Sequence, residues 1–132
     1  WVHDFQLLAV GERLRSAGLR NRCVFFLHIP FPPPDIFAKL PWRQELLTAL
    51  LAYDVVGVQT ERDVRNLVDC IVERLPATVE RGKDRVLVHM DGRTTEIGSF
   101  PISIDVAEFA DLAGTPEVAE RSADIRRRVG GG

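Results

Sequence analysis

Apolar and polar residues are arranged in blocks along the chain, and the blocks predict strands that alternate with helices. Continuous apolar runs, typical of strands covered on both faces, lie at 22–28 and 54–59, and a shorter strand is expected at 1–3. Apolar residues at helical spacing follow these strands, over roughly 5–17, 42–52 and 61–75. Because strand and helix alternate, we expect an α/β fold with a Rossmann-like parallel sheet and flanking helices.

The pattern changes after Pro76. Residues 85–90 and 94–100 flank Asp91-Gly92, a dipeptide that is a strong signal for a tight turn between antiparallel strands. We therefore expect an antiparallel hairpin at the edge of the parallel sheet. Two further helices are predicted, over 106–113 and from Pro116 onward. The pattern contains no internal repeat and predicts no domain boundary within the chain.

Several residues predict where helices begin. Pro41 suits the first position of the helix over 42–52, and a short helix is expected over 36–40. Thr60 is the predicted N-cap of the next helix, with Asp63 as an acid in its first turn.

Composition bounds the function. The 132 residues carry 17 basic and 19 acidic side chains, a net charge of −2, which argues against nucleic acid or an anionic membrane as the main partner. No apolar stretch reaches the length of a membrane span. Cys23 and Cys70 lack metal-like spacing, so we expect two buried free thiols in a reducing cytoplasm. The chain begins at Trp1, inside an expected strand, and we therefore expect a fragment of a longer protein.

Polar residues follow three of the predicted strands. His28 ends an apolar strand and precedes a loop with prolines at 30 and 32–34, which hold the loop rigid. Asp4 and Gln59 occupy the same position after their own strands. In open α/β sheets ligands bind beyond the carboxyl ends of the strands, so the three residues are candidate site residues. From the residues alone, the favoured explanation of Asp4 is a helix N-cap and that of Gln59 is a polar turn residue, whereas His28 is equally explained as a functional residue and as a packed or surface histidine.

Familiar catalytic motifs are missing. The sequence contains no GxGxxG, P-loop, GxSxG, HExxH or paired CxxC. Dinucleotide oxidoreductases of the usual type, P-loop NTPases, serine hydrolases and zinc proteases are therefore not the first choices.

Five blocks of sequence carry a resemblance to a known family. They are WVHDFQLL, FFLHIPFPPPDIF, LPWRQELL, VVGVQT and SFPISID, and they occur in the same order as in trehalose-6-phosphate synthases. The resemblance implies half of a GT-B fold, and transfer of glucose from UDP-glucose to glucose 6-phosphate with retention of configuration, without a metal or cofactor. It implies that Asp4 binds the acceptor sugar and that His28 contacts the transferred glucose, and we expect both to be catalytic residues. Gln59 is a weaker substrate-binding assignment.

The resemblance also implies what the chain lacks. The glycine-rich loop that helps to hold the donor would precede Trp1, and the Arg and Lys that neutralise the leaving diphosphate would belong to an absent C-terminal donor domain. We therefore expect residues 1–132 to be part of the acceptor-side domain and to be inactive alone. Ser103 stands where many family members have glycine. A glucosylglycerol-phosphate synthase and a non-catalytic regulatory homologue that binds sugar phosphates remain alternatives, and self-association is left open.

Overall fold

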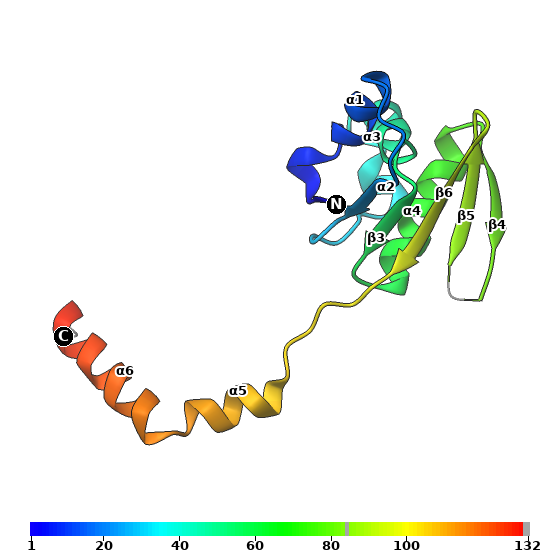
Figure 1. The fold of residues 1–132 in the computed structure, drawn as a ribbon. Helices are drawn as coiled ribbons and strands as arrows, with labels where there is room; N and C mark the ends of the chain where they lie inside the picture. Colours follow the sequence, from blue (N-terminus) through cyan, green and yellow to red (C-terminus); the bar gives the residue numbers. More distant parts are fainter. Residues whose placement is uncertain (84, 131–132) are drawn as a thin grey trace. The chain divides into compact units, whose positions relative to one another are not determined.

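A computed structural model of the chain describes residues 1–83 and 85–130, which separate into two compact units (Figure 1). The first unit is Trp1–Pro101 and the second is Ile102–Gly132. The hydrophobic pattern did not predict this division, because the second unit continues the rhythm of apolar positions without adding residues to the core. None of its described residues is buried.

The first unit is built on a six-stranded sheet with the strand order β1-β2-β3-β6-β5-β4 (Figure 1). The strands are β1 (Val2–His3), β2 (Val24–Phe26), β3 (Val55–Val58), β4 (Thr78–Arg81), β5 (Val86–Met90) and β6 (Arg93–Ser99). β1, β2, β3 and β6 are parallel, whereas β5 and β4 run antiparallel to their neighbours. The predicted α/β sheet with an antiparallel hairpin is confirmed.

The hairpin turn is the one that the sequence predicts. Asp91 and Gly92 have φ values of 50° and 73°, the left-handed conformation that a tight hairpin turn requires. β6 then pairs with β3, so the hairpin's second strand continues the parallel part of the sheet. β4 was not predicted: its residues are mostly exposed and lack a clear alternation, and only pairing with β5 defines it as a strand.

The helices of the first unit are η1 (Phe5–Leu7, a 3-10 turn), α1 (Val10–Ser16), α2 (Pro34–Phe37), α3 (Arg43–Leu50) and α4 (Glu61–Arg74). The prediction of one helix over 5–17 was wrong. An α-helix here would need the Gly11 N–H to donate to the Leu7 carbonyl. Instead the buried Tyr53 hydroxyl accepts from Gly11 N at 2.9 Å and donates to Leu7 O at 3.1 Å. This inserted hydroxyl takes both partners of the helical bond and divides the segment in two.

A proline begins α2 rather than α3, where Pro41 was expected to occupy the first helical position. α2 begins at Pro34, which has the backbone geometry of a first helical position, whereas Pro41 lies in the turn before α3. The predicted start of α4 is confirmed. Thr60 and Asp63 form a reciprocal capping box, in which each side chain bonds the other residue's backbone N–H.

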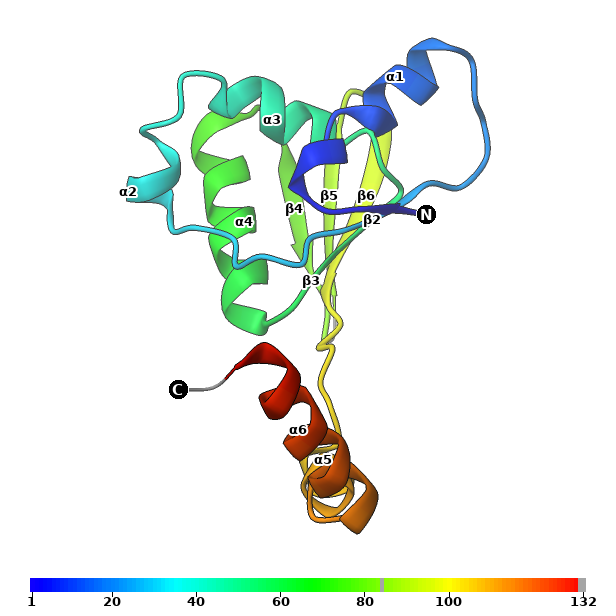
Figure 2. The same cartoon turned by 90° about the vertical axis from the view of Figure 1, so that its left-hand side faces the viewer.

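The core lies between the sheet and the helices on it. α4 packs against β3 and β6, and α3 lies beside it on the same face (Figure 2). α4 turns most of its apolar side to the core, with Leu67, Val68 and Ile71 at 0% exposure. Burying side chains of this kind stabilises the fold by about 1.5–3 kcal/mol each.

The second unit consists of two helices, α5 (Val106–Ala113) and α6 (Pro116–Val129). Asp105 caps α5 by accepting from Ala107 N and Glu108 N, and Thr115 caps α6. Both helices lie where the sequence predicted them. In the part of the chain that the structure describes, no helix is long and apolar enough to cross a membrane.

Candidate functional site

The carboxyl ends of four parallel strands meet at one edge of the sheet. In the register of the sheet His3 lies opposite Phe26, Phe26 opposite Gly57, and Val58 opposite Ser99. The residues that follow β1, β2 and β3 therefore share this edge, and they include Asp4, His28 and Gln59. The sheet thus brings the three predicted site residues to one place, as expected for an open α/β sheet. Their roles in binding stay predictions.

Asp4 is held in a conformation that few residues other than glycine adopt. Its φ is 70° and its ψ is 163°, and such a backbone costs on the order of 1–3 kcal/mol. Two hydrogen bonds hold it: Asp4 N donates to Phe26 O at 2.8 Å, and Asp4 Oδ1 accepts from Phe5 N at 3.1 Å. The interpretation as an N-cap is confirmed. Strained backbone of this kind clusters at active sites and ligand-binding sites.

His28 is exposed, but other rings orient its imidazole. His28 Nε2 lies 3.0 Å from His3 Nδ1, and the ring centroids are 5.2 Å apart with an interplanar angle of 22°, so the two rings meet edge to edge. Phe26 contacts the His28 ring edge-on at 4.7 Å. Sequence reasoning gave His3 no role. The signal that could have found it is strand register, which places β1 beside β2 although the two histidines are 25 residues apart.

The proline loop after His28 is tied to α4. Phe31 N donates to Asp63 Oδ1 at 3.1 Å, and Asn66 Nδ2 donates to Phe31 O at 2.9 Å. Phe31 is itself buried and packs on Phe37 with ring centroids 5.1 Å apart. The sequence predicted a rigid loop, but it did not reveal that Asp63 fixes the loop as well as the start of α4.

Gln59 lies between β3 and the capping box of α4. It is half-buried, and it follows the point where Leu27 N donates to Gly57 O at 2.9 Å. This bond keeps β2 and β3 paired up to the residue before His28. The backbone of Gln59 is therefore held between a paired strand and a capped helix.

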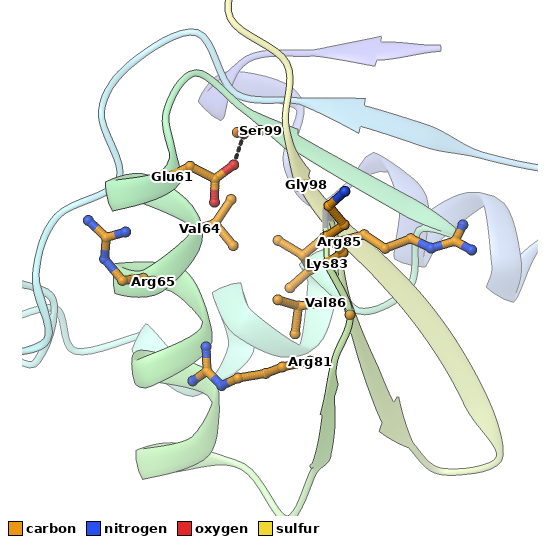
Figure 3. Close-up of a pocket in the computed structure, with 11 residues that line it drawn as sticks. Glu61, Val64, Arg65, Arg81, Lys83, Arg85, Val86, Gly98 and Ser99 are labelled. Atoms are coloured by element: carbon orange, nitrogen blue, oxygen red, sulfur yellow. Dashed lines mark hydrogen bonds between the residues drawn. The ribbon is translucent and has the colours of Figure 1, made fainter.

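A separate pocket of about 150 Å³ lies between α4, the end of β6 and the segment before β5 (Figure 3). Its lining includes the four basic residues Arg65, Arg81, Lys83 and Arg85 and one acid, Glu61, which accepts a short hydrogen bond from Ser99. Arg81 pairs with Asp69 at 3.7 Å and Arg85 with Glu96 at 3.3 Å. The guanidinium groups of Arg65 and Arg85 extend in opposite directions (Figure 3). These two cations therefore do not converge on a common point.

The Cys70 thiol and the Tyr53 hydroxyl both keep their protons at neutral pH. Burial, together with the negative charges of the neighbouring Glu73 and Asp69, raises the pKa of the Cys70 thiol to about 11. Burial likewise raises the pKa of the Tyr53 hydroxyl above its ordinary value of 10.0. Cys23 and Cys70 are both free and buried, as predicted. Among residues 1–83 and 85–130 no three His, Cys, Asp or Glu side chains gather as metal ligands would.

Comparison of the chain with known proteins tests the resemblance that the five sequence blocks carry. The model of "Glycosyltransferase family 20" matches residues 1–132, the whole chain. The chain belongs to glycosyltransferase family 20. Among family 20 relatives, the trehalose-6-phosphate synthase of Enterobacter sp. (strain 638) is 39% identical over 129 residues, which are 96% of this chain and 27% of the relative. That of Mycolicibacterium vanbaalenii is 37% identical over 135 residues, 98% of this chain and 28% of the relative.

Solved structures of family 20 enzymes share the fold. An alpha,alpha-trehalose-phosphate synthase (UDP-forming) from Burkholderia xenovorans, in complex with glucose-6-phosphate, matches with a TM-score of 0.78 and 35% identity, covering 92% of this chain and 28% of that one. An E. coli structure bound with UDP-2-fluoro glucose matches with a TM-score of 0.77 and 36% identity, over 96% of this chain and 28% of that one. The chain thus spans little more than a quarter of the length of these relatives.

Proposed function

We propose that the chain is the acceptor-side part of a trehalose-6-phosphate synthase, which transfers glucose from UDP-glucose to glucose 6-phosphate. The observation that carries the proposal is the match of the family 20 model to all of residues 1–132. Support comes from the relatives, which are trehalose-6-phosphate synthases, and from two similar structures that hold glucose-6-phosphate and a UDP-glucose analogue. The rest of a GT-B enzyme would supply the donor domain.

The proposed reaction exchanges one glycosidic bond for another. The bond between C1 of the donor glucose and the UDP diphosphate breaks, and C1 bonds to the anomeric oxygen of glucose 6-phosphate. UDP leaves with the bonding electron pair, and the proton of the acceptor hydroxyl passes to the departing diphosphate or to solvent. Configuration at the donor C1 is retained.

Three residues carry the proposed contacts. The Asp4 carboxylate accepts hydrogen bonds from hydroxyls of the acceptor sugar, which suits an ionised side chain at an accessible strand end. The His28 imidazole donates to or accepts from a hydroxyl of the transferred glucose. Gln59, directly after the next strand, contributes a weaker polar contact. The shared sheet edge of the three supports placing both sugars there.

The test uses the complete reading frame that encodes the chain. It is incubated with UDP-glucose and either glucose 6-phosphate or glycerol 3-phosphate, and products are identified by mass spectrometry. We expect trehalose 6-phosphate, with kcat/KM reduced roughly 100-fold or more in His28→Ala and in Asp4→Ala. Glucosylglycerol phosphate would move the assignment to the related synthase, and no product with any acceptor would favour the regulatory homologue.

The hairpin offers matched controls. His89 is a third histidine, bonded to Thr94 on the strand pair β5–β6, and Asp91 is a second aspartate with positive φ. Both lie outside the proposed site, so His89→Ala and Asp91→Ala should keep the activity of the parent. If His89→Ala falls as far as His28→Ala, the loss reflects general damage and the assignment of His28 is wrong.

A cytoplasmic location is part of the same proposal. It is supported by the two free, buried thiols, which suit a reducing compartment.

A further inference from the structure

His3 and His28 contact each other at the sheet edge that carries the candidate site. The proposed function gives a role to His28 but none to this contact. Nδ1 of His3 lies 3.0 Å from Nε2 of His28, and the interplanar angle of the two rings is 22°. We propose that His3 is a positioning residue: it holds the imidazole of His28 in one orientation and couples the tautomer of His28 to its own, so that Nδ1 of His28 is presented to the transferred glucose. This inference rests on the proposed function for the identity of the ligand.

Hydrogen-bond chemistry requires the two rings to act together. A neutral imidazole has one N–H donor and one acceptor nitrogen, so a bond between His3 Nδ1 and His28 Nε2 needs one ring to donate and the other to accept. Whichever ring donates, the bond determines whether Nδ1 of His28 carries a proton. The tautomer of His3 therefore determines whether Nδ1 of His28, the nitrogen available to a ligand, donates or accepts a hydrogen bond.

Ring packing fixes the geometry of the pair. The ring of Trp1 packs against the ring of His3, with the two centroids 4.6 Å apart. Phe26 contacts the ring of His28 edge-on. Phe26 is in turn 5% exposed and lies opposite His3 in the strand register. An exposed histidine that only faced solvent would have no such set of contacts, and its orientation would not be restricted.

His3 is not needed for the core. It is exposed and lies on a two-residue edge strand. Substitutions here should therefore leave the fold intact, which separates a positioning role from a structural one.

Two substitutions test the hydrogen bond in the complete reading frame. His3→Phe keeps an aromatic ring at this position but removes the nitrogen, whereas the amide of His3→Asn can replace Nδ1 as donor or acceptor. We expect His3→Phe to lower kcat at least about tenfold, corresponding to about 1.4 kcal/mol of transition-state stabilisation, with KM for glucose 6-phosphate unchanged. His3→Asn should recover most of that loss. Wild-type kcat in His3→Phe, or no recovery in His3→Asn, would overturn the proposal.

The double variant asks whether His3 acts through His28. If it does, His3→Phe combined with His28→Ala should be no slower than His28→Ala alone, because residues that act as a unit have non-additive effects. Losses that multiply would mean that His3 acts independently, and the positioning role would be wrong.

A spectroscopic readout keeps the inference separate from the proposed function. Histidines of the complete protein are labelled with ¹⁵N, and the ring signals of His28 are assigned by their disappearance in His28→Asn. His3→Phe should shift the His28 Nε2 signal, and His89→Ala should not. If no acceptor gives product, the proposed function fails, yet this shift still supports the histidine pair. An unchanged His28 signal overturns the pair whatever the activity.

Discussion

At the scale of single residues, the buried hydroxyl of Tyr53 decides how the chain folds after β1. It bonds both Gly11 N and Leu7 O, the two groups that an uninterrupted helix would join. We expect Tyr53→Phe to lower the free energy of unfolding by about 1–3 kcal/mol, because two polar groups lose a buried partner. Urea unfolding followed by circular dichroism measures the change. Thr48→Ala, on the exposed side of α3, is the control and should stay within about 0.5 kcal/mol.

The same hydroxyl gives a pH dependence. Burial raises the pKa of Tyr53 above 10.0, so the folded state holds this proton more tightly than the unfolded state. The resulting stability is fully present below pH 10 and is lost as pH rises through the folded pKa. The difference in unfolding free energy between the parent and Tyr53→Phe should therefore shrink above pH 10. A constant difference from pH 8 to 11 would contradict this account.

Gly57 supports His28 indirectly. A Cβ at Gly57 would lie 2.7 Å from Cδ2 of Phe26 and 3.1 Å from Cδ2 of Phe100, and Phe26 holds the edge of the His28 ring. Gly57→Ala should cost roughly 1–3 kcal/mol of stability through overpacking, and displacement of Phe26 should also lower kcat. Gly114→Ala is the matched control, since its nearest neighbour would be 3.5 Å away. Equal behaviour of the two variants would rule out the role of Gly57.

Single residues were predictable where local pattern carried the information. Asp4, His28 and Gln59 follow strands that the sequence shows, so their shared edge followed from the rules for parallel sheets. The contact of His3 with His28 and the insertion of Tyr53 between Leu7 and Gly11 were not predictable. Both join residues 25 or more positions apart, and only strand register and core packing bring them together.

At the scale of elements, Asp63 links α4 to the proline loop. It is 2% exposed and accepts hydrogen bonds from Phe31 N, Thr60 N and the Thr60 hydroxyl. Asp63→Ala should destabilise the fold by roughly 2–4 kcal/mol, because the bonds of the Asp63 side chain in the capping box are lost and buried Phe31 N has no partner. Asp69→Ala on the same helix, exposed and paired only loosely with Arg81, should cost less than about 1 kcal/mol. Thermal unfolding compares the two, and similar melting temperatures would contradict the linking role.

The elements themselves were predictable in proportion to their periodicity. α4, with its capping box and its long apolar stripe, begins where Thr60 predicts, and β5 and β6 lie on either side of the predicted turn. β4 is the counterexample, since an edge strand that is mostly exposed needs no apolar alternation. Pro41 shows the same limit for helix starts: its fixed φ suits a turn as well as a first helical position.

At the scale of the whole molecule, the chain forms a sheet unit and a separate helical unit. The sheet unit has its own core, whereas α5 and α6 keep large apolar side chains exposed, among them Phe109 at 56% and Val129 at 77%. Exposed apolar surface of this kind marks a site of contact with other protein or a tendency to aggregate. We expect the isolated chain to bind the dye ANS. Truncation to residues 1–101 should reduce the fluorescence, and undiminished fluorescence would place the apolar surface on the sheet unit instead.

The isolated chain should not catalyse the proposed transfer. Negative charge builds up on the departing diphosphate, and Asp4, His28 and Gln59 supply no permanent cation to neutralise it. The relatives are more than three times as long as the part that this chain matches, which leaves room for such groups elsewhere. At equal molar concentration, we expect residues 1–132 to form trehalose 6-phosphate at least about 100-fold more slowly than the complete reading frame. Circular dichroism of the same sample establishes that the chain is folded, and transfer by the folded chain at a comparable rate would show that the sheet edge alone contains the catalytic groups.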